Sequence, residues 1–349
     1  LGYNSLTTIL ASLQNSILVL ESTKNGWKTQ SLNLNNPTCL VFDPRNSGRA
    51  YCGTFDNGLW KTDDNGQTWE KTSLNTSGYN ITTISASHIE KGDHFSKLFV
   101  GMEPSMIFSS IDGGQTWEII DEFKKLPSSS TWSFPPKPTT HHIRWIEPDT
   151  NNKEYIFVAI EAGALIKSID GGRTWIDKVE TGPYDTHILR THKKSPQRLY
   201  SAAGDGYFES QDYGVTWEKL DDGLGQYTYL SGIGVNSDSP QNIIISAAKN
   251  AWKAHSRQDA ESFIYRRLDD IDKNDKSWTL INDDNGLPDS KGTIISVIES
   301  NPKIKDEFYC LNNRGIYCST DSGVCWNTLQ ISWSKEYTLQ HPWGLAVCE

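Results

Sequence analysis

The stretch SSIDGGQTWEI (109–119) returns almost unchanged as KSIDGGRTWID (167–177). Alignment on the tryptophan shows five copies of S/T-x-D-x-G-x-T/C-W, namely TDDNGQTW (62–69), SIDGGQTW (110–117), SIDGGRTW (168–175), SQDYGVTW (210–217) and STDSGVCW (319–326). A degenerate copy ends at Trp278 and a shortened copy ends at Trp27. In such a segment the aspartate accepts hydrogen bonds from the backbone of a hairpin turn, the glycine supplies a positive φ, and the tryptophan packs between sheets. We therefore predict a structural role, without chemistry, for the aspartates of these repeat turns: Asp64, Asp112, Asp170, Asp212 and Asp321.

The repeat resembles the Asp-box, or BNR, motif of sialidases, xyloglucan hydrolases, sortilin-type receptors and photosystem assembly factors. The resemblance covers nearly the whole chain and implies a β-propeller. Those families include enzymes, receptors and scaffolds, so the resemblance alone does not select a function.

Each copy follows a run of short alternating strands. Residues 141–179 show the pattern best, as HHIRWIE, YIFVAIE, ALIKSI and, after the turn, TWIDKV. Four short strands make one propeller blade. Complete units cover 37–73, 81–122, 141–179, 186–221, 230–283 and 293–331. The N-terminal segment supplies a second, third and fourth strand, and PWGLAVCE at the C-terminus supplies a first strand. We predict an all-β, seven-bladed propeller in a single domain, 1–349, whose ring closes by joining both ends in one blade.

Charge and composition exclude some classes of partner. The net charge is −10 and the isoelectric point is near 5.3, which argues against nucleic acid, since binding to phosphates needs a basic patch. No apolar run approaches the roughly 20 residues that cross a bilayer. LGYNSLTTIL lacks the pattern of a secretory leader, which favours a cytoplasmic location. The first residue is not Met, so secretion stays open as an alternative.

One face of the predicted disc collects the residues that could carry chemistry. The repeat turns lie on the opposite face, whereas first strands begin and second strands end on this one, which we call the mouth face. First strands begin near His142 and His187, which we align with each other, and near His341. Second strands end at the aligned Glu103 and Glu161, with Asp205 nearby. The two largest insertions, 123–140 and 249–262, also emerge here, and loops of that length usually bind something.

We expect Glu103, His142, Glu161 and His187 to surround one mouth of the central channel. Their predicted neighbours are His141, Arg144, Arg190, Asp205, His255 and His341. Imidazoles and carboxylates that converge in a concave site can bind one divalent metal ion or transfer protons. The predicted metal ligands are His142, His187, His255 and His341, and the predicted catalytic groups are Glu103, Glu161, Asp205, Arg144 and Arg190. Two alternatives are a polar small-molecule site without catalysis and plain structural hydrogen bonding at strand starts.

Aromatic residues in the two insertions suggest a lid. Trp132 and Phe134 stand beside prolines that stiffen the first insertion, and Trp252 lies in the second. We assign these three side chains and His141 to substrate contact or closure. The alternative is a loop clamped onto the disc by aromatic burial.

Three functions compete. The first is a propeller with a His/carboxylate site for a small molecule, acting as a hydrolase or lyase through a metal-bound water. The second is a non-catalytic binding or scaffold propeller with a protein partner, as the resemblance to assembly factors implies. The third is a glycoside hydrolase acting on carbohydrate. A sialidase is disfavoured because the Arg-Ile-Pro segment of that family is missing, and a xyloglucan-type hydrolase usually joins two propellers around its cleft.

Overall fold

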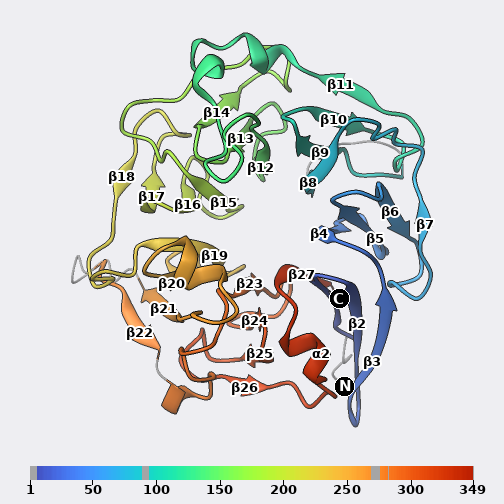
Figure 1. Ribbon diagram of the computed structural model, residues 1–349, viewed down its shortest axis with the longest axis vertical. Coiled ribbons are helices and arrows are strands. Elements are labelled where there is room, and N and C mark those ends of the chain that lie inside the picture. The colour runs from blue at the N-terminus through green and yellow to red at the C-terminus, as the bar shows by residue number, and fades with distance from the viewer. Residues whose placement is uncertain (1–5, 89–93, 269–275, 282, 349) are drawn as a thin grey trace.

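Seven small antiparallel sheets surround a central axis in the computed structural model, which confirms the predicted propeller (Figure 1). The structure describes residues 6–88, 94–268, 276–281 and 283–348. Blade 1 has the strand order β27-β1-β2-β3, so both ends of the chain meet in one sheet, as expected. Closing the ring in this way leaves no open edge between the first and last blades.

Strands are numbered along the chain, and each blade runs from its innermost strand outward. Blade 1 contains β27 (Pro342–Cys348), β1 (Thr8–Leu13), β2 (Ser16–Thr23) and β3 (Gly26–Asn33). Blade 2 contains β4 (Pro37–Asp43), β5 (Asn46–Thr54), β6 (Leu59–Thr62) and β7 (Glu70–Lys71). Blade 3 contains β8 (Asn80–Ala86), β9 (Leu98–Glu103), β10 (Ile107–Ser110) and β11 (Glu118–Ile120). Blade 4 contains β12 (Ile143–Pro148), β13 (Ile156–Ile160) and β14 (Ala164–Ser168).

The remaining blades follow the same plan. Blade 5 contains β15 (Thr186–Thr191), β16 (Leu199–Ala203), β17 (Gly206–Ser210) and β18 (Glu218–Lys219). Blade 6 contains β19 (Tyr229–Val235), β20 (Asn242–Ala248), β21 (Ser262–Leu268) and β22 (Thr279–Ile281). Blade 7 contains β23 (Val297–Ser300), β24 (Phe308–Asn312), β25 (Gly315–Ser319) and β26 (Asn327–Thr328). Short helical turns are η1 (Glu122–Lys125), η2 (Pro127–Thr131), α1 (Ala251–His255), η3 (Asp283–Asn285) and α2 (Lys335–Thr338).

Burial is greatest in the second strands and least in the outermost ones. The second strands β13 (IFVAI) and β16 (LYSAA) are buried along their whole length, because the neighbouring blades cover both of their faces. The outermost strands β7 and β18 are fully exposed. The core therefore consists of layers between blades, for example Ile243 and Ile245 of blade 6 with Tyr200 of blade 5. No helix among the described residues is long and apolar enough to cross a membrane.

The repeat turns have the predicted geometry. Asp112 Oδ1 accepts hydrogen bonds from the backbone N–H groups of Gln115 and Thr116, at 3.0 and 2.9 Å. Trp117 Nε1 donates to the carbonyl of Gly114 at 3.1 Å. Equivalent backbone bonds to the aspartate recur in the other four turns, at Asp64, Asp170, Asp212 and Asp321. These carboxylates are used within their own turns.

Blade 4 lacks the fourth strand that its sequence predicts. TWIDKV forms only one isolated bridge, between Lys167 and Ile176. The carboxylate of Asp177 accepts hydrogen bonds from the backbone N–H and the hydroxyl of Ser128 in η2, at 2.9 and 2.5 Å. The insertion 123–140 thus binds the segment that would otherwise continue along β14.

Candidate functional site

Six of the seven innermost strands carry a β-bulge at the same place, close to the mouth face. Pairing with the adjacent strand skips one residue in each, namely Thr38, Thr82, Arg144, His187, Ser231 and Trp343. A bulge redirects the extra side chain away from the strand's regular alternation. Five of these residues, all except His187, line a central channel. The bulges therefore select which side chains face the channel.

At three of the bulges the side chain joins its blade to the next one. Each side chain donates a hydrogen bond to the backbone carbonyl of the residue that precedes the bulge in the next blade. The three bonds are Thr38 Oγ1 to Ile81 at 2.9 Å, Thr82 Oγ1 to Ile143 at 2.6 Å, and His187 Nδ1 to Leu230 at 2.5 Å. Because a carbonyl only accepts, His187 Nδ1 carries the proton. His187 makes the same link as the threonines, and its second ring nitrogen lies 3.6 Å from Asp185 Oδ2.

Arg144 occupies the equivalent bulge in blade 4 but binds Glu161 instead. Its Nε lies 3.3 Å from Glu161 Oε2, and the same oxygen accepts from His142 Nε2 at 2.7 Å. Burial alone would raise the pKa of Glu161, but the His142 hydrogen bond and the Arg144 charge lower it to about 2. Glu161 is therefore ionised near neutral pH. The Arg144 side chain lines the channel, and Glu161 is its only ion-pair partner among the described residues.

Glu103 extends this network into blade 3, as the sequence predicts. Its Oε2 lies 3.7 Å from His142 Nδ1, which is buried and makes no hydrogen bond within the described residues. Its Oε1 lies 3.2 Å from Nζ of Lys137, which belongs to the first insertion. The structure thus brings Glu103, His142 and Glu161 together.

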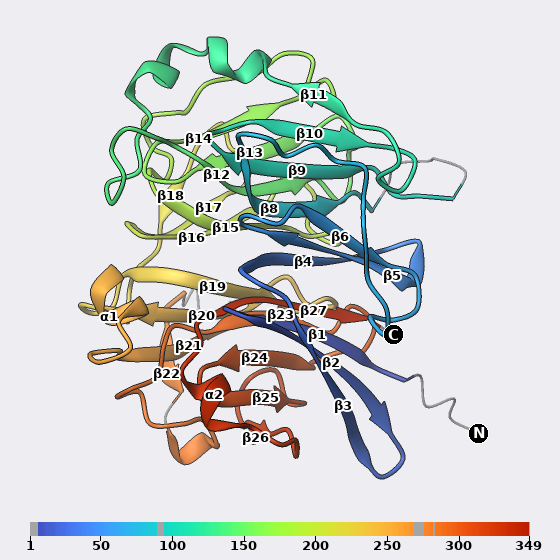
Figure 2. The ribbon, with the colours of Figure 1, turned by 45° about the vertical axis from the view of Figure 1, so that its right-hand side comes forward.

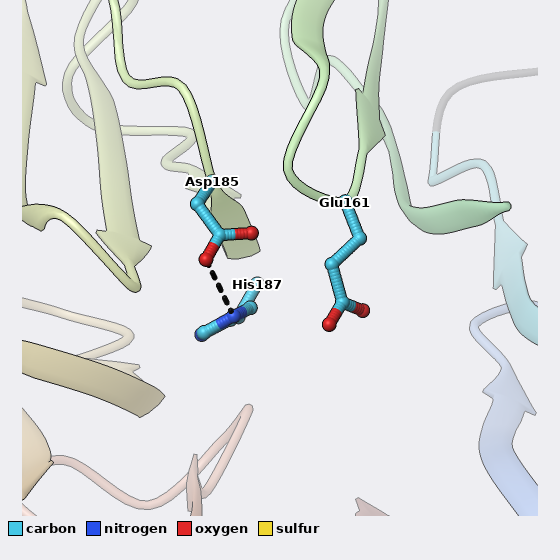
Figure 3. Close-up of side chains that lie close together, drawn as sticks. All are labelled: Glu161, Asp185 and His187. Atoms are coloured by element: carbon cyan, nitrogen blue, oxygen red, sulfur yellow. Dashed lines mark ion pairs between the residues drawn. The ribbon is translucent and has the colours of Figure 1, made fainter. Parts of the chain in front are cut away.

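His187 lies in a second, adjoining cluster. The residue is only 2% exposed, and its Nε2 lies 3.6 Å from Asp185 Oδ2. Glu161 offers a third ligand atom, and all three atoms lie within 4.8 Å of one another (Figure 3). Burial alone would lower the pKa of His187, but Asp185 and Glu161 raise it above its ordinary value. Sequence reasoning missed Asp185, although it lies two residues before His187.

The predicted alignment of His142 with His187 is wrong. His187 shares the bulge position of Arg144, and the residue equivalent to His142 is Asp185. Matching the two histidines as strand starts therefore places the blades out of register by two residues. Glu103 and Glu161 are equivalent, as predicted, because each follows the same paired position at the end of a second strand.

His255 and His341 form a pair of their own. His341 Nδ1 donates to the carbonyl of Pro342 at 2.6 Å, so its Nε2 accepts from His255 Nδ1 at 2.8 Å, and His255 Nε2 accepts from Tyr229 at 3.2 Å. All four ring nitrogens are used within this chain of hydrogen bonds. Burial lowers the pKa of His255 to about 3 and that of His341 to about 4. Both rings are therefore neutral at physiological pH.

These neutral rings predict a loss of stability in acid that His255→Gln will reduce. In the unfolded chain His255 becomes protonated as the pH falls below its ordinary pKa of 6.5, whereas in the folded chain it stays neutral down to about pH 3. The stability that is fully present above pH 6.5 is therefore lost progressively as the pH falls. We expect the variant to remove about 1 kcal/mol of this loss per pH unit between roughly pH 6 and 5. Urea unfolding at about pH 6 and about pH 5 measures the free energy of unfolding of wild type and variant. The control is His94→Gln, which replaces an exposed histidine. Equal losses in wild type and His255→Gln would show that His255 does not stay neutral.

Arg190 points to a different level of the channel from the mouth cluster. It forms an ion pair with Glu299 of blade 7 and lies over the Trp145 ring at 4.8 Å. Burial raises the pKa of Glu299 to about 7, and burial also raises the pKa of Glu147, whose carboxylate accepts from Thr191 N at 2.9 Å. The negative charge of Glu147 adds to the upward shift in the pKa of Glu299, whereas the charge of Arg190 opposes it.

Asp205 and His141 lie beside the clusters and hold loops. Asp205 accepts from the backbone N–H groups of Tyr184 and Asp185, at 3.1 and 3.2 Å, and so positions the residues that precede β15. His141 Nδ1 bonds the hydroxyl of Ser105 at 2.7 Å. Neither side chain belongs to the group of potential ligands around His187.

The predicted lid aromatics behave differently from one another. Trp132 is buried, stacks on Phe123 and donates from Nε1 to Ser128 Oγ at 3.0 Å, so burial clamps this part of the loop onto the disc. Phe134 packs its ring edge against His142 with centroids 4.7 Å apart. Trp252 on α1 is exposed and donates to Asp259 at 3.0 Å.

Sequence reasoning also missed Tyr229, Glu299 and Trp343. Trp343 follows His341 by two residues, and its ring stacks on that histidine with centroids 4.1 Å apart. Glu299 lies inside strand β23, where a charged residue beside the buried Ile298 was the available signal. Tyr229 carried no comparable signal, because its role depends on helix α1 bringing His255 to it.

Comparison with known proteins identifies relatives of two kinds. A family described as photosynthesis system II assembly factor YCF48 matches residues 19–282. A xyloglucanase from Paenibacillus sp is 24% identical over 307 residues, which is 76% of this chain but only 28% of that enzyme.

Solved structures share the fold. An ancestral GH74 enzyme superposes with a TM-score of 0.63 at 16% identity, over 86% of this chain and 40% of that one. YCF48 bound to D1 peptide superposes with a TM-score of 0.57 at 19% identity, over 96% of this chain and 88% of that one. YCF48 from Cyanidioschyzon merolae has a TM-score of 0.56 at 12% identity, over 84% of each chain. At these identities the superpositions show the fold alone, whereas the family match extends over most of the sequence. The chain belongs to the family of photosynthesis system II assembly factor YCF48.

Proposed function

We propose that this chain is a non-catalytic binding propeller that docks a segment of a partner protein over the channel mouth. Membership in the assembly-factor family supports a protein partner, and a solved relative is a complex of YCF48 with D1 peptide. The observation that carries the proposal is a group of exposed aromatic side chains around a channel that Arg144 lines.

Three large aromatic residues lie exposed on the mouth face. Tyr184 (49% exposed) precedes β15, Trp252 (65%) lies on α1 directly after β20, and Trp343 (41%) occupies the bulge of β27. Figure 2 shows α1 at the side of the disc where β19 begins and β20 ends. Trp, Tyr and Arg are the side chains that contribute most to protein interfaces, because they cover much area at a small entropic cost.

Arg144 supplies the polar anchor of this surface. Its Nε pairs with Glu161 Oε2, and the side chain lines the channel. A guanidinium with two parallel N–H groups binds a carboxylate in bidentate fashion. We infer that the docked segment presents an acidic side chain or a C-terminal carboxylate to Arg144 and apolar groups to the aromatic residues.

A library of phage-displayed peptides with free C-termini tests the proposal. Peptides selected on the wild-type protein are measured by fluorescence anisotropy against Arg144→Gln and Trp343→Ala. We expect each variant to weaken binding by about tenfold or more. The control is Arg173→Gln, whose side chain is exposed in a repeat turn on the opposite face. Failure to select any peptide, or an equal loss in the control, would overturn docking at the mouth.

Glycoside hydrolysis is a second candidate, favoured by the likeness to a xyloglucanase and by Glu299. Glycosidases need one protonated carboxyl as general acid. The ionised Glu161 cannot supply that proton, but a carboxyl with a pKa of about 7 can. Release of reducing ends from xyloglucan oligosaccharides, lost in Glu299→Gln, would favour this candidate over docking. Hydrolase or lyase chemistry by a metal-bound water stays a prediction, as does the cytoplasmic location.

A further inference from the structure

Three side chains bring potential metal-ligand atoms close together at the channel mouth. Glu161 comes from the loop after β13, and Asp185 and His187 come from the start of β15 (Figure 3). One atom of each lies within 4.8 Å of the others. We propose that Glu161, Asp185 and His187 bind one divalent transition-metal ion, Mn²⁺ or Zn²⁺.

The tautomer of His187 is the first argument. The Leu230 carbonyl accepts from Nδ1, so Nε2 is the nitrogen that presents a lone pair whenever the ring is neutral. That nitrogen lies 3.6 Å from Asp185 Oδ2, beyond hydrogen-bond distance. A ring nitrogen that donates to a backbone carbonyl while the other faces carboxylates is the usual arrangement of a metal-bound histidine.

Both carboxylates are oriented by other groups and keep one oxygen available. Asp185 Oδ1 accepts from the backbone N–H of Ala162 at 2.8 Å, which leaves Oδ2 toward His187. Glu161 Oε2 takes the bonds from His142 and Arg144, which leaves Oε1 without a hydrogen-bond partner among the described residues. Such outer hydrogen bonds hold ligand oxygens in place and reduce the entropy lost on binding an ion.

The neighbouring glycine makes room for this arrangement. Gly204 occupies the position in blade 5 that Glu161 occupies in blade 4, since each N–H donates to the carbonyl of the equivalent strand-start residue, Asp185 or His142. A Cβ at Gly204 would lie 2.1 Å from Asp185 Oδ2 and 3.3 Å from His187 Cε1. Any other residue would therefore displace the carboxylate that faces His187.

Charge and donor type select the ion. Glu161 and Asp185 contribute two negative charges, and Arg144 offsets one of them, so the pocket favours a cation when the imidazoles are neutral. Two carboxylate oxygens with one imidazole suit Mn²⁺ or Zn²⁺ better than Mg²⁺ or Ca²⁺, which prefer oxygen alone. Three protein ligands leave further coordination positions for water or for a bound ligand.

The test measures the ion directly, without any peptide, so its result is independent of the docking proposal. Wild-type protein is dialysed against Mn²⁺ or Zn²⁺, its metal content is measured by inductively coupled plasma mass spectrometry, and its affinity is measured by titration calorimetry. We expect one ion per chain in wild type and an affinity lower by about tenfold or more in Asp185→Asn and His187→Gln. Glu218→Gln, on the exposed strand β18, is the control and should bind the ion as wild type does.

Gly204→Ala provides a variant that removes no ligand. Its methyl group should displace the Asp185 carboxylate and lower the affinity for the ion by a similar factor. The circular dichroism spectrum should stay unchanged. Absence of bound ion in the wild type, or equal affinity in wild type and Asp185→Asn, would overturn the site. So would nitrogen NMR showing both His187 nitrogens protonated at neutral pH in the presence of the ion, because a proton would then occupy the ligand position.

Discussion

Replacing Glu209 with alanine will lower the free energy of unfolding by about 3–5 kcal/mol. Glu209 of β17 is buried and binds two arginines: Arg198 in a bidentate pair, with Nη2 2.8 Å from Oε2, and Arg267 of β21 through Oε1. Tyr207 also donates to Oε1 at 2.7 Å. Removing the carboxylate would leave two buried guanidinium groups without their shared counter-charge at the junction of blades 5 and 6.

Chemical unfolding followed by tryptophan fluorescence measures the effect of Glu209→Ala. The control is Glu218→Ala on β18, where an exposed pair with Lys276 at 3.5 Å should contribute less than about 1 kcal/mol. If both variants lost the same small amount, the Arg198–Glu209–Arg267 group would be no more important than a surface ion pair.

Trp326→Ala should cost about 3–5 kcal/mol by leaving a cavity between blades 6 and 7. The indole is 3% exposed and belongs to a cluster with Ile244 of β20 and Ile298 of β23. Its Nε1 donates to the carbonyl of Gly323 at 3.2 Å, so truncation also leaves that buried acceptor without its partner.

Thermal and urea unfolding of Trp326→Ala should be compared with Trp252→Ala, whose side chain is 65% exposed and should change stability little. Trp117 is a half-buried tryptophan of another repeat turn, and we expect Trp117→Ala to lose an amount of stability between those of Trp326→Ala and Trp252→Ala. A loss for Trp326→Ala no larger than for Trp252→Ala would contradict its place in the inter-blade core.

The sequence by itself determined the blades, their number and the closure of the ring. These features depend on local interactions, because the hydrogen bonds of a repeat turn such as that of Asp112 lie within a few residues of the aspartate. Because the same local interactions require the same residue types, each repeat turn can be recognised in the sequence. The convergence of Glu103, His142 and Glu161 could also be predicted, since blade topology places strand starts and strand ends on one face.

Only the tertiary structure decided which side chains enter the channel and which partners they take. The bulges at Arg144, His187 and Trp343 depend on pairing between strands and leave no sequence signature. The hydrogen bond from His187 to Leu230 spans 43 residues and sets the tautomer on which the cation site depends. Burial, which raises the pKa of Glu299 and lowers that of His255, is likewise a property of seven packed blades. Local sequence therefore predicts the seven-bladed propeller. Strand register and desolvation depend on contacts between distant residues, and they determine the chemistry at the channel mouth.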